Sequence, residues 1–325
     1  MKAILTGVVG LALAAGASGA SLSPPTTYRG MCDASAATSL SADLFAVAND
    51  EDNILRVYHR RTGGMPAFSF DMNSFLRIGK KNPEADIEAS AMIGDRIYWI
   101  TSHGRNAKGK DAPNRERFFA TRFFVTNNTV SMTPIGRPYT LLLDDFFREP
   151  RLSRFHLILA SLLAPKEHGA LNIEGLTSTP EGHLLIGFRN PIPQGKALLV
   201  PLLNPAELID GRSARFGDPL LLDLGGYGIR SMGGEQNNYL IIAGSYNSDG
   251  ESRAYTWAGP GTVPVQLQGV SFPGFNPEGI ALSKEGGVTD FFVVSDDGTL
   301  KIGGVECKRL KDPAQRQFRG YLLLP

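Results

Sequence analysis

Five short, mostly apolar runs recur along the chain, and polar or glycine residues end each of them. The runs are Leu44-Phe-Ala-Val47, Arg96-Ile-Tyr-Trp-Ile100, Leu184-Leu-Ile-Gly-Phe188, Tyr239-Leu-Ile-Ile242 and Phe291-Phe-Val-Val294. Four or five residues are too few for a helix, and the β-branched and aromatic residues in these runs are typical of buried strands. Turn residues precede four of the five runs. We therefore predict that each run is the second strand of an antiparallel hairpin.

A second pattern precedes each of these strands and consists of a charged residue, small residues and a short apolar stretch. Its five copies begin at Asp33, Glu88, Glu174, Arg230 and Glu278. A polar residue follows each start after 15 to 18 residues, namely Asp50, His103, Arg189, Tyr246 and Asp296. Self-similarity at this scale indicates a radial or stacked repeat architecture.

The spacing of the copies indicates the number of repeats. Successive copies start 55, 86, 56 and 48 residues apart, and four-stranded blades suit all but the longest interval. That interval carries about 30 extra residues, and we assign them to a mostly helical insertion around residues 139–163, where Pro150 must break or start a helix. The sequence predicts an all-β fold, a five-bladed β-propeller. Six blades are the alternative, if the insertion hides a degenerate blade.

Residues 1–20 are predicted to be a secretory signal peptide, and residues 21–325 a single propeller domain. Lys2 is a minimal basic region, an apolar stretch follows, and small residues up to Ala20 offer cleavage sites. No other stretch is long and apolar enough to span a bilayer. We expect an exported protein, periplasmic or extracellular, with no membrane span once the signal is removed.

The charge balance argues against polyanionic partners such as nucleic acids and anionic membranes. The 325 residues include 33 basic and 32 acidic side chains, and the formal net charge is +1. Such a balance carries no electrostatic signature of nucleic-acid or anionic-membrane binding. A small-molecule ligand or substrate remains a candidate partner, and the sequence leaves the oligomeric state open.

The two cysteines, Cys32 and Cys307, lie near the start of the first repeat and the end of the last. In an oxidising compartment an even pair favours a disulfide; the alternative is two unpaired buried thiols. A strand over residues 318–323 is expected to complete a sheet with the N-terminal segment. The disulfide would then join the two ends of the ring.

A propeller brings the repeat residues to one place. The innermost strand of each blade runs along the central axis and the second returns antiparallel, so the start of one and the end of the other share a channel mouth. Carboxylates gathered there repel one another unless a cation, an arginine or a proton neutralises them. Hard oxygen ligands suit Ca²⁺ best. The candidate metal ligands are Asp33, Glu88, Glu174, Glu278 and Asp296. Alternatively, these carboxylates accept hydrogen bonds or pair with arginines.

His103 is the only histidine at a repeat position. An imidazole beside Glu88 would act as a general base near neutral pH, so His103 and Glu88 are the candidate catalytic residues. The alternative is a hydrogen-bonded loop histidine. Other polar residues at the strand ends are candidates for holding an anionic substrate group: Arg105, Asn106, Arg189, Asn190 and Arg230.

Eight short motifs stand out: Gly30-Met-Cys-Asp-Ala-Ser-Ala-Ala37, Asn49-Asp-Glu-Asp-Asn53, Glu84-Ala-Asp-Ile-Glu88, Ser102-His-Gly-Arg-Asn106, Leu171-Asn-Ile-Glu-Gly175, Gly187-Phe-Arg-Asn-Pro191, Asp223-Leu-Gly-Gly-Tyr-Gly-Ile-Arg230 and Ser295-Asp-Asp-Gly298. Together they resemble an uncharacterised, mainly bacterial family, domain-of-unknown-function family 3616. The resemblance extends from about Gly30 to Arg319. It implies a propeller-like fold and no established activity or catalytic residues.

A looser resemblance lies in Asn276-Pro-Glu-Gly-Ile280, which is similar to a motif of calcium-dependent propeller lactonases and phytase-like propellers. Those groups place oxygen ligands at the channel mouth. The resemblance adds a little weight to hydrolysis as a function of this chain.

Two functions therefore stay open. One is metal-assisted hydrolysis of esters, lactones or phosphoesters at the channel mouth, with Ca²⁺ as the cofactor. The other is non-catalytic binding of a small ligand or a protein. The usual serine-hydrolase and zincin motifs are absent. Gly104 to Lys110 match the spacing of a phosphate loop, but Asp111 replaces the magnesium-binding hydroxyl and a predicted strand replaces the helix, so we reject that site.

Overall fold

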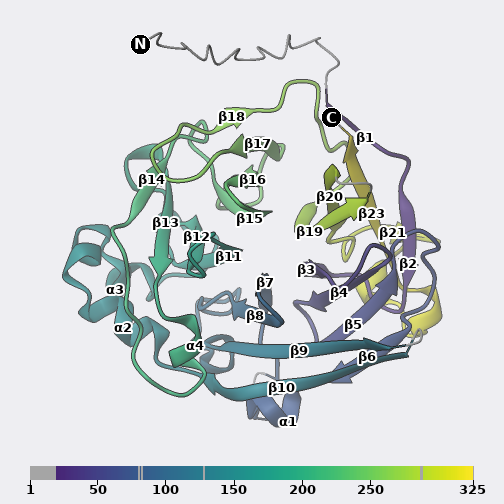
Figure 1. The fold of residues 1–325 in the computed structure, drawn as a ribbon, viewed down its shortest axis with the longest axis horizontal. Helices are drawn as coiled ribbons and strands as arrows, with labels where there is room; N and C mark the ends of the chain where they lie inside the picture. Colours follow the sequence, from purple (N-terminus) through teal and green to yellow (C-terminus); the bar gives the residue numbers. More distant parts are fainter. Residues whose placement is uncertain (1–19, 80, 82, 127–128, 286–287, 325) are drawn as a thin grey trace, which may run out of the picture.

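Five β-sheets surround a central axis (Figure 1). The computed structural model describes residues 20–79, 81, 83–126, 129–285 and 288–324. The predicted five-bladed β-propeller is confirmed, and the insertion that suggested a sixth blade is helical. The predicted signal peptide falls on residues 1–20, of which 1–19 lie outside the described residues.

Four of the blades are runs of four antiparallel strands, with the innermost strand first along the chain. Blade 1 contains β3 (Ala34–Ser39), β4 (Leu44–Asn49), β5 (Ile54–His59) and β6 (Phe68–Asp71). Blade 2 contains β7 (Ile87–Ile93), β8 (Arg96–Thr101), β9 (Phe118–Thr126) and β10 (Thr129–Tyr139). Blade 3 contains β11 (Asn172–Ser178), β12 (Leu184–Asn190), β13 (Ala197–Leu202) and β14 (Leu220–Leu222). Blade 4 contains β15 (Gly228–Glu235), β16 (Asn238–Gly244), β17 (Arg253–Trp257) and β18 (Val265–Gln266).

Blade 5 joins the two ends of the chain. Its inner strands are β19 (Pro277–Glu285), β20 (Val288–Ser295) and β23 (Gln317–Leu324), and the N-terminal strands β1 (Ser21–Leu22) and β2 (Thr26–Arg29) pair with the outer edge of β23. Tyr28 of β2 stacks on Phe318 of β23 with ring centroids 4.9 Å apart. The predicted Cys32–Cys307 disulfide is present beside this junction, with the two Cα atoms 5.9 Å apart.

The predicted helical insertion is also present. It contains α2 (Leu142–Arg148), a 3₁₀ segment (Pro150–Phe155) that begins at the proline, and α3 (Leu157–Ala160). Its buried residues, including Phe146 and Phe155, pack into the core between blades 2 and 3. Among the described residues, none of the helices is long and apolar enough to cross a membrane.

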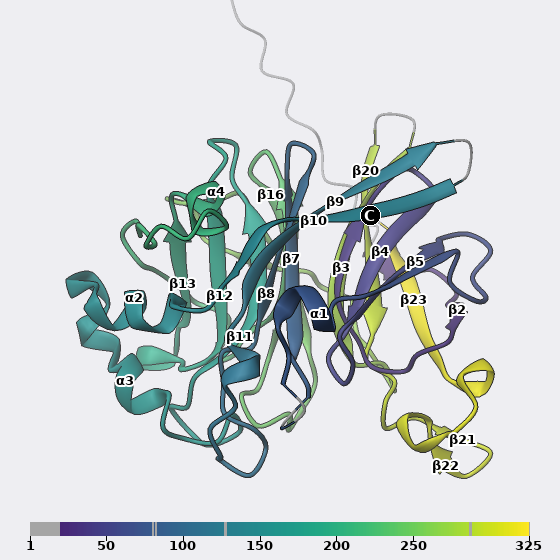
Figure 2. The ribbon, with the colours of Figure 1, turned by 90° about the horizontal axis from the view of Figure 1, so that it is seen from below.

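The remaining elements are short. They are α1 (Asn73–Leu76), α4 (Pro205–Leu208), the hairpin β21 (Lys301–Ile302) and β22 (Val305–Glu306), and the 3₁₀ turns Pro113–Arg115, Pro193–Gly195, Cys307–Arg309 and Pro313–Gln315. Figure 2 shows α3 and the β21–β22 hairpin toward one end of the propeller, and the β9–β10 hairpin toward the other.

The small residues of the repeat are required by close packing around the axis. A Cβ atom on Gly279 would lie 2.4 Å from the Ser35 carbonyl oxygen of the neighbouring blade and 2.5 Å from a Val294 methyl group. A Cβ atom on Gly175 would lie 2.7 Å from the side chain of Ile229. Inner strands of adjacent blades approach so closely that a larger side chain would force them apart.

Candidate functional site

The charged repeat residues sit on irregularities in the inner hairpins. The strand register shifts between Ile87 and Ala89, and likewise across Glu174, Arg230 and Glu278. Blade 1 shifts between Ala34 and Ala37. A bulge leaves one residue out of the pairing and re-aims its side chain. The same local feature therefore presents one charged side chain from each of blades 2 to 5 to the central channel.

These side chains border one large cavity of about 1310 Å³. Its wall includes the repeat residues Glu88, Glu174, Arg230 and Glu278, and the strand-end residues Asp50, Arg189, Asp296 and Asp297. The structure therefore brings together residues from all five blades. Acidic side chains outnumber basic ones in the wall, so the interior carries a negative potential when the acids are ionised.

Buried arginines pair with the repeat glutamates of blades 3 and 5. Arg189 Nη1 donates to Glu174 Oε1 over 2.7 Å, and Arg230 Nη2 donates to Glu278 Oε1. The other donors of Arg189 bond Ser245 and Ser248. Both arginines are thus paired with acids of the protein, which is the ion-pair alternative raised from the sequence, and the buried Nε of Arg230 has no partner among the described residues.

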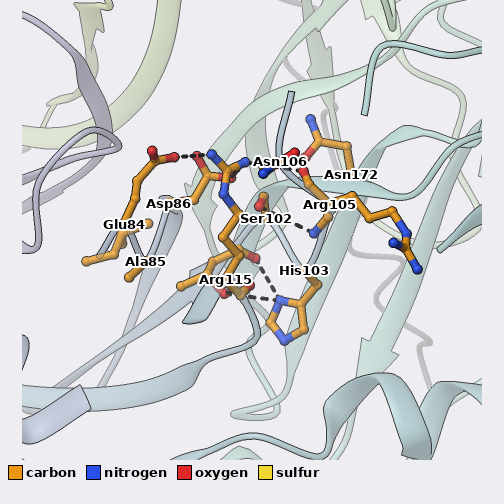
Figure 3. A network of polar contacts seen from close by, with 12 residues as sticks. Glu84, Ala85, Asp86, Ser102, His103, Arg105, Asn106, Arg115 and Asn172 are labelled. Atoms are coloured by element: carbon orange, nitrogen blue, oxygen red, sulfur yellow. Dashed lines mark hydrogen bonds and ion pairs between the residues drawn. The ribbon is translucent and has the colours of Figure 1, made fainter. Parts of the chain in front are cut away.

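A further network joins Arg115 to two acids. Arg115 Nη1 donates to Asp86 Oδ2 over 2.8 Å, and Arg115 Nη2 donates to Glu84. Figure 3 shows this guanidinium pointing toward the two carboxylates. Burial and Asp86 raise the pKa of Glu84 to about 7. Asp86, Glu84 and Arg115 all line the central cavity.

Three carboxylates of blades 1 and 2 lack such partners. Asp33, Asp50 and Glu88 accept no side-chain hydrogen bond or ion pair within the described part of the chain. Burial, followed by the charges of Asp296 and Glu278, raises the pKa of Asp50 well above its ordinary value. Burial and nearby acids, Asp86 first, raise the pKa of Glu88 likewise. The carboxylates on this side of the channel therefore have no basic side chain among the described residues to neutralise them.

Asp33 lies against Asp296 rather than in the cavity wall. The two residues form an isolated β-bridge, and burial with the Asp296 charge raises the pKa of Asp33 to about 7. Asp296 accepts bonds from the Gly298 amide (2.8 Å) and from Asn276 Nδ2 (3.0 Å). A Cβ atom on Gly298 would lie 1.7 Å from Asp33 Oδ1, so a larger residue there would displace the Asp33 carboxylate.

The structure does not bring the other predicted site residues to this cavity. His103 has a positive φ of 53°, which turns it away, and its Nδ1 is held by the Thr101 carbonyl at 2.8 Å. It lines a second cavity together with Arg105. The expected His103–Glu88 pairing is therefore absent.

Asn106 accepts hydrogen bonds from the backbone amides of Lys108 and Lys110 in its own loop. Asn190 is buried and donates to the carbonyls of Pro165 and Glu167.

The donor set at the mouth bears on whether a metal ion would fit. Orphaned carboxylate oxygens, such as Asp50 Oδ1 and Glu174 Oε2, are hard ligands of the kind that Ca²⁺ prefers. Yet within the described ranges, no group of three or more acids or histidines is arranged to hold a metal ion. The chemistry suits a hard cation, and the arrangement is not that of a closed metal site.

Sequence reasoning missed a second set of polar residues two positions before the bulged ones. Asn172 Nδ2 donates to Glu174 Oε1 over 2.7 Å, and Asn276 Nδ2 approaches Glu278 Oε1 at 3.4 Å. Asp86 precedes Glu88 in the same way. The signal was available, because alternate residues of a strand share a face and the three sites read Asp-x-Glu, Asn-x-Glu and Asn-x-Glu. Arg115 lies in a loop that carries no repeat signal.

The fold and cavity define a five-bladed propeller with an acidic channel mouth. The model of a family described as "Protein of unknown function (DUF3616)" matches residues 137–268, from the end of β10 to just past β18. The resemblance to that family is confirmed over this span. A search of curated proteins finds no match.

Solved structures are similar to this chain at low identity. The glutaminyl cyclase of Myxococcus xanthus is 11% identical, with a TM-score of 0.46 over 94% of this chain and 98% of that chain. The PQQ-bound aldose sugar dehydrogenase of Streptomyces coelicolor is 9% identical, with a TM-score of 0.44 over 93% and 99%. A β-xylosidase, RS223, is 10% identical, with a TM-score of 0.44 over 93% and 95%.

Proposed function

We propose that the channel mouth is a recognition site for a small positively charged ligand. The observation that carries this proposal is a set of three carboxylates without a basic partner in the described part of the chain. Asp50 and Glu88 lie in the cavity wall, and Asp33 lies next to Asp296. A buried carboxylate without a partner costs free energy, either as an ion or through the proton it must hold. A bound cation would remove that cost.

The engaged arginines support a cation rather than an anion. Arg189, Arg230 and Arg115 already bond carboxylates. An anionic ligand would have to displace those carboxylates and leave them unpaired as well. Since breaking a buried ion pair costs about 3–5 kcal/mol, binding an anion here is less favourable in free energy than binding a cation.

Thermal unfolding tests this proposal. Ca²⁺, Mg²⁺, 1,4-diaminobutane and choline are titrated at pH 8 against the wild-type protein, the Asp50→Asn/Glu88→Gln variant and Glu181→Gln, an acid in the exposed β11–β12 turn. A ligand at a hundred times its Kd stabilises the native state by about 2.7 kcal/mol. We expect at least one cation to raise the Tm of wild type and Glu181→Gln by several degrees, and to leave the double variant unchanged. Sodium phosphate is titrated in the same way as an anionic probe. Stabilisation by phosphate and not by the cations, or by none of these ligands, contradicts the proposal.

A second candidate is calcium-assisted hydrolysis of an ester, lactone or phosphoester. The orphaned oxygens of Asp50 and Glu174 favour it. These two acids and Asp296 of the cavity wall would have to move together to hold the ion, since no three acids of the described residues are so arranged as they stand. Ca²⁺ held by these oxygens would polarise a carbonyl or phosphoryl oxygen of the substrate. In this proposal, Glu88 accepts the proton of the attacking water once its own proton has been lost.

Turnover of chromogenic esters and phosphoesters separates the two candidates. Hydrolysis predicts turnover that requires Ca²⁺, stops with chelator and is abolished in Glu88→Gln while near-ultraviolet circular dichroism is unchanged. Cation binding without turnover of any substrate in the panel supports recognition alone.

A further inference from the structure

A second cavity of about 210 Å³ lies between the loop after β8 and the helical insertion. Its wall includes His103, Asp111, Glu116 and Asp144, together with the apolar side chains of Leu143 and Phe147. Leu143, Asp144 and Phe147 belong to α2, whereas the other three residues come from the segment between β8 and β9. None of these side chains lines the central cavity.

His103 contributes an unpartnered hydrogen-bond acceptor to this cavity. A carbonyl oxygen can only accept, so the 2.8 Å contact with Thr101 requires the proton on Nδ1 and leaves Nε2 with its lone pair. The side chain is 2% exposed, and Nε2 has no partner among the described residues. Figure 3 shows the ring at the backbone end of Arg115, away from the carboxylates of Glu84 and Asp86. Burial lowers the pKa of His103 to about 4, so the imidazole is neutral at physiological pH.

The carboxylates add further acceptors. Asp111, Glu116 and Asp144 make no side-chain hydrogen bond or ion pair within the described residues. Burial, then the charges of Asp111 and Asp144, raise the pKa of Glu116 to about 7. Among the described residues of the wall, Arg105 carries the one guanidinium group, and its Nε and Nη1 already donate to the carbonyls of Ser161 (2.9 Å) and Gly109 (3.2 Å). Asp111 and Asp144 are exposed to solvent, so half-buried Glu116 and buried His103 are the acceptors that lack a donor among the described residues.

We infer that this cavity binds a primary alkylamine in its ammonium form. The ammonium group brings three donors and a positive charge to Glu116, the flanking aspartates and the bare nitrogen of His103. The alkyl chain lies against Leu143 and Phe147. A metal ion fits less well, since within the described part of the chain no three acids or histidines are arranged to hold one. The inference is independent of the function proposed for the central cavity.

Histidine-selective ¹⁵N NMR of the full chain tests the inference, because only five histidines contribute signals. n-Butylammonium chloride is titrated at pH 8, with 1-butanol and ZnCl₂ as separate probes. We expect the Nε2 resonance of His103 to shift in a saturable manner with the amine and not with the alcohol. A charge-assisted hydrogen bond contributes about 1.5–3 kcal/mol, so Glu116→Gln should weaken the amine at least about tenfold.

The controls separate recognition from general electrostatics. Glu181→Gln makes the same change in a remote turn and should leave the affinity for n-butylamine unchanged. The inference is overturned if the His103 signal does not move with the amine, or if it moves equally with 1-butanol or only with ZnCl₂. It is also overturned if Glu116→Gln leaves the affinity for the amine unaltered.

Discussion

At the scale of single residues, chemically similar acids differ because of their neighbours. Glu174 and Glu278 occupy the same repeat position as Glu88, but each has a buried arginine within bonding distance. Glu88 and Asp50 have none among the described residues. The sequence predicted that these acids would gather, and it could not say which would be paired, because Arg189 and Arg230 reach their partners through three-dimensional packing.

Acids with raised pKa values make stability depend on pH. Burial raises the pKa to about 7 for both Asp33 and Glu116. The native state therefore binds more protons than the unfolded state between about pH 4 and pH 7. Stability from this source is complete below the unfolded pKa values and is lost as the pH rises through the native ones. We expect the metal-free protein to be less stable at pH 8 than at pH 5.5 in urea denaturation.

The variant Asp50→Asn/Glu88→Gln should flatten this dependence, because it removes two of the acids that must be ionised. A protein whose stability rises steadily between pH 5.5 and pH 8 would show that the buried carboxylates are ionised without penalty, contrary to this account.

At the scale of elements, the inner hairpins were the most predictable part of the molecule. Apolar runs such as Tyr239-Leu-Ile-Ile242 have both faces buried between neighbouring blades, so their composition is diagnostic. The outer strands β6, β14 and β18 are short and partly exposed, and no hydrophobic pattern marks them. The bulges were not visible in the sequence either, although the small residues beside them were.

Those small residues provide a test of the packing. Gly279→Ala places a methyl group within 2.5 Å of Ser35 and Val294, and overpacking of this kind costs about 1–3 kcal/mol. Gly79→Ala is the matched control, since its Cβ atom would have no neighbour within 4 Å. We expect chemical denaturation to show a loss of stability for the first variant and little change for the second. Equal effects would mean that the inner strands can separate without cost.

At the scale of the whole molecule, the ring depends on joining its first and last segments. β2 supplies an outer strand of blade 5, and the disulfide links residues 275 positions apart beside that junction. The sequence predicted both features, because a single pair of cysteines near opposite ends of a chain expected to be exported favours a disulfide between those ends. It did not place His103, whose left-handed backbone carries it into another cavity.

Removing the disulfide should therefore loosen the ring closure. Closing a loop of this length restricts the unfolded chain, and in the chain-entropy model the effect is about 5 kcal/mol. We expect Cys32→Ala/Cys307→Ala to unfold at a clearly lower denaturant concentration than the oxidised wild type, and the wild type treated with reductant to behave like the variant. Identical midpoints for all three would show that strand pairing alone closes the ring.

The central claim is that a cation at the channel mouth replaces protons held by unpaired carboxylates. The most direct measurement is calorimetric titration at pH 6.5, with the best cation from the thermal panel, in two buffers of different ionisation enthalpy. Because binding must ionise acids whose pKa values are raised, the account predicts net proton release in the wild-type protein and less in Asp50→Asn/Glu88→Gln. Binding without proton release, or equal release in both proteins, would contradict it.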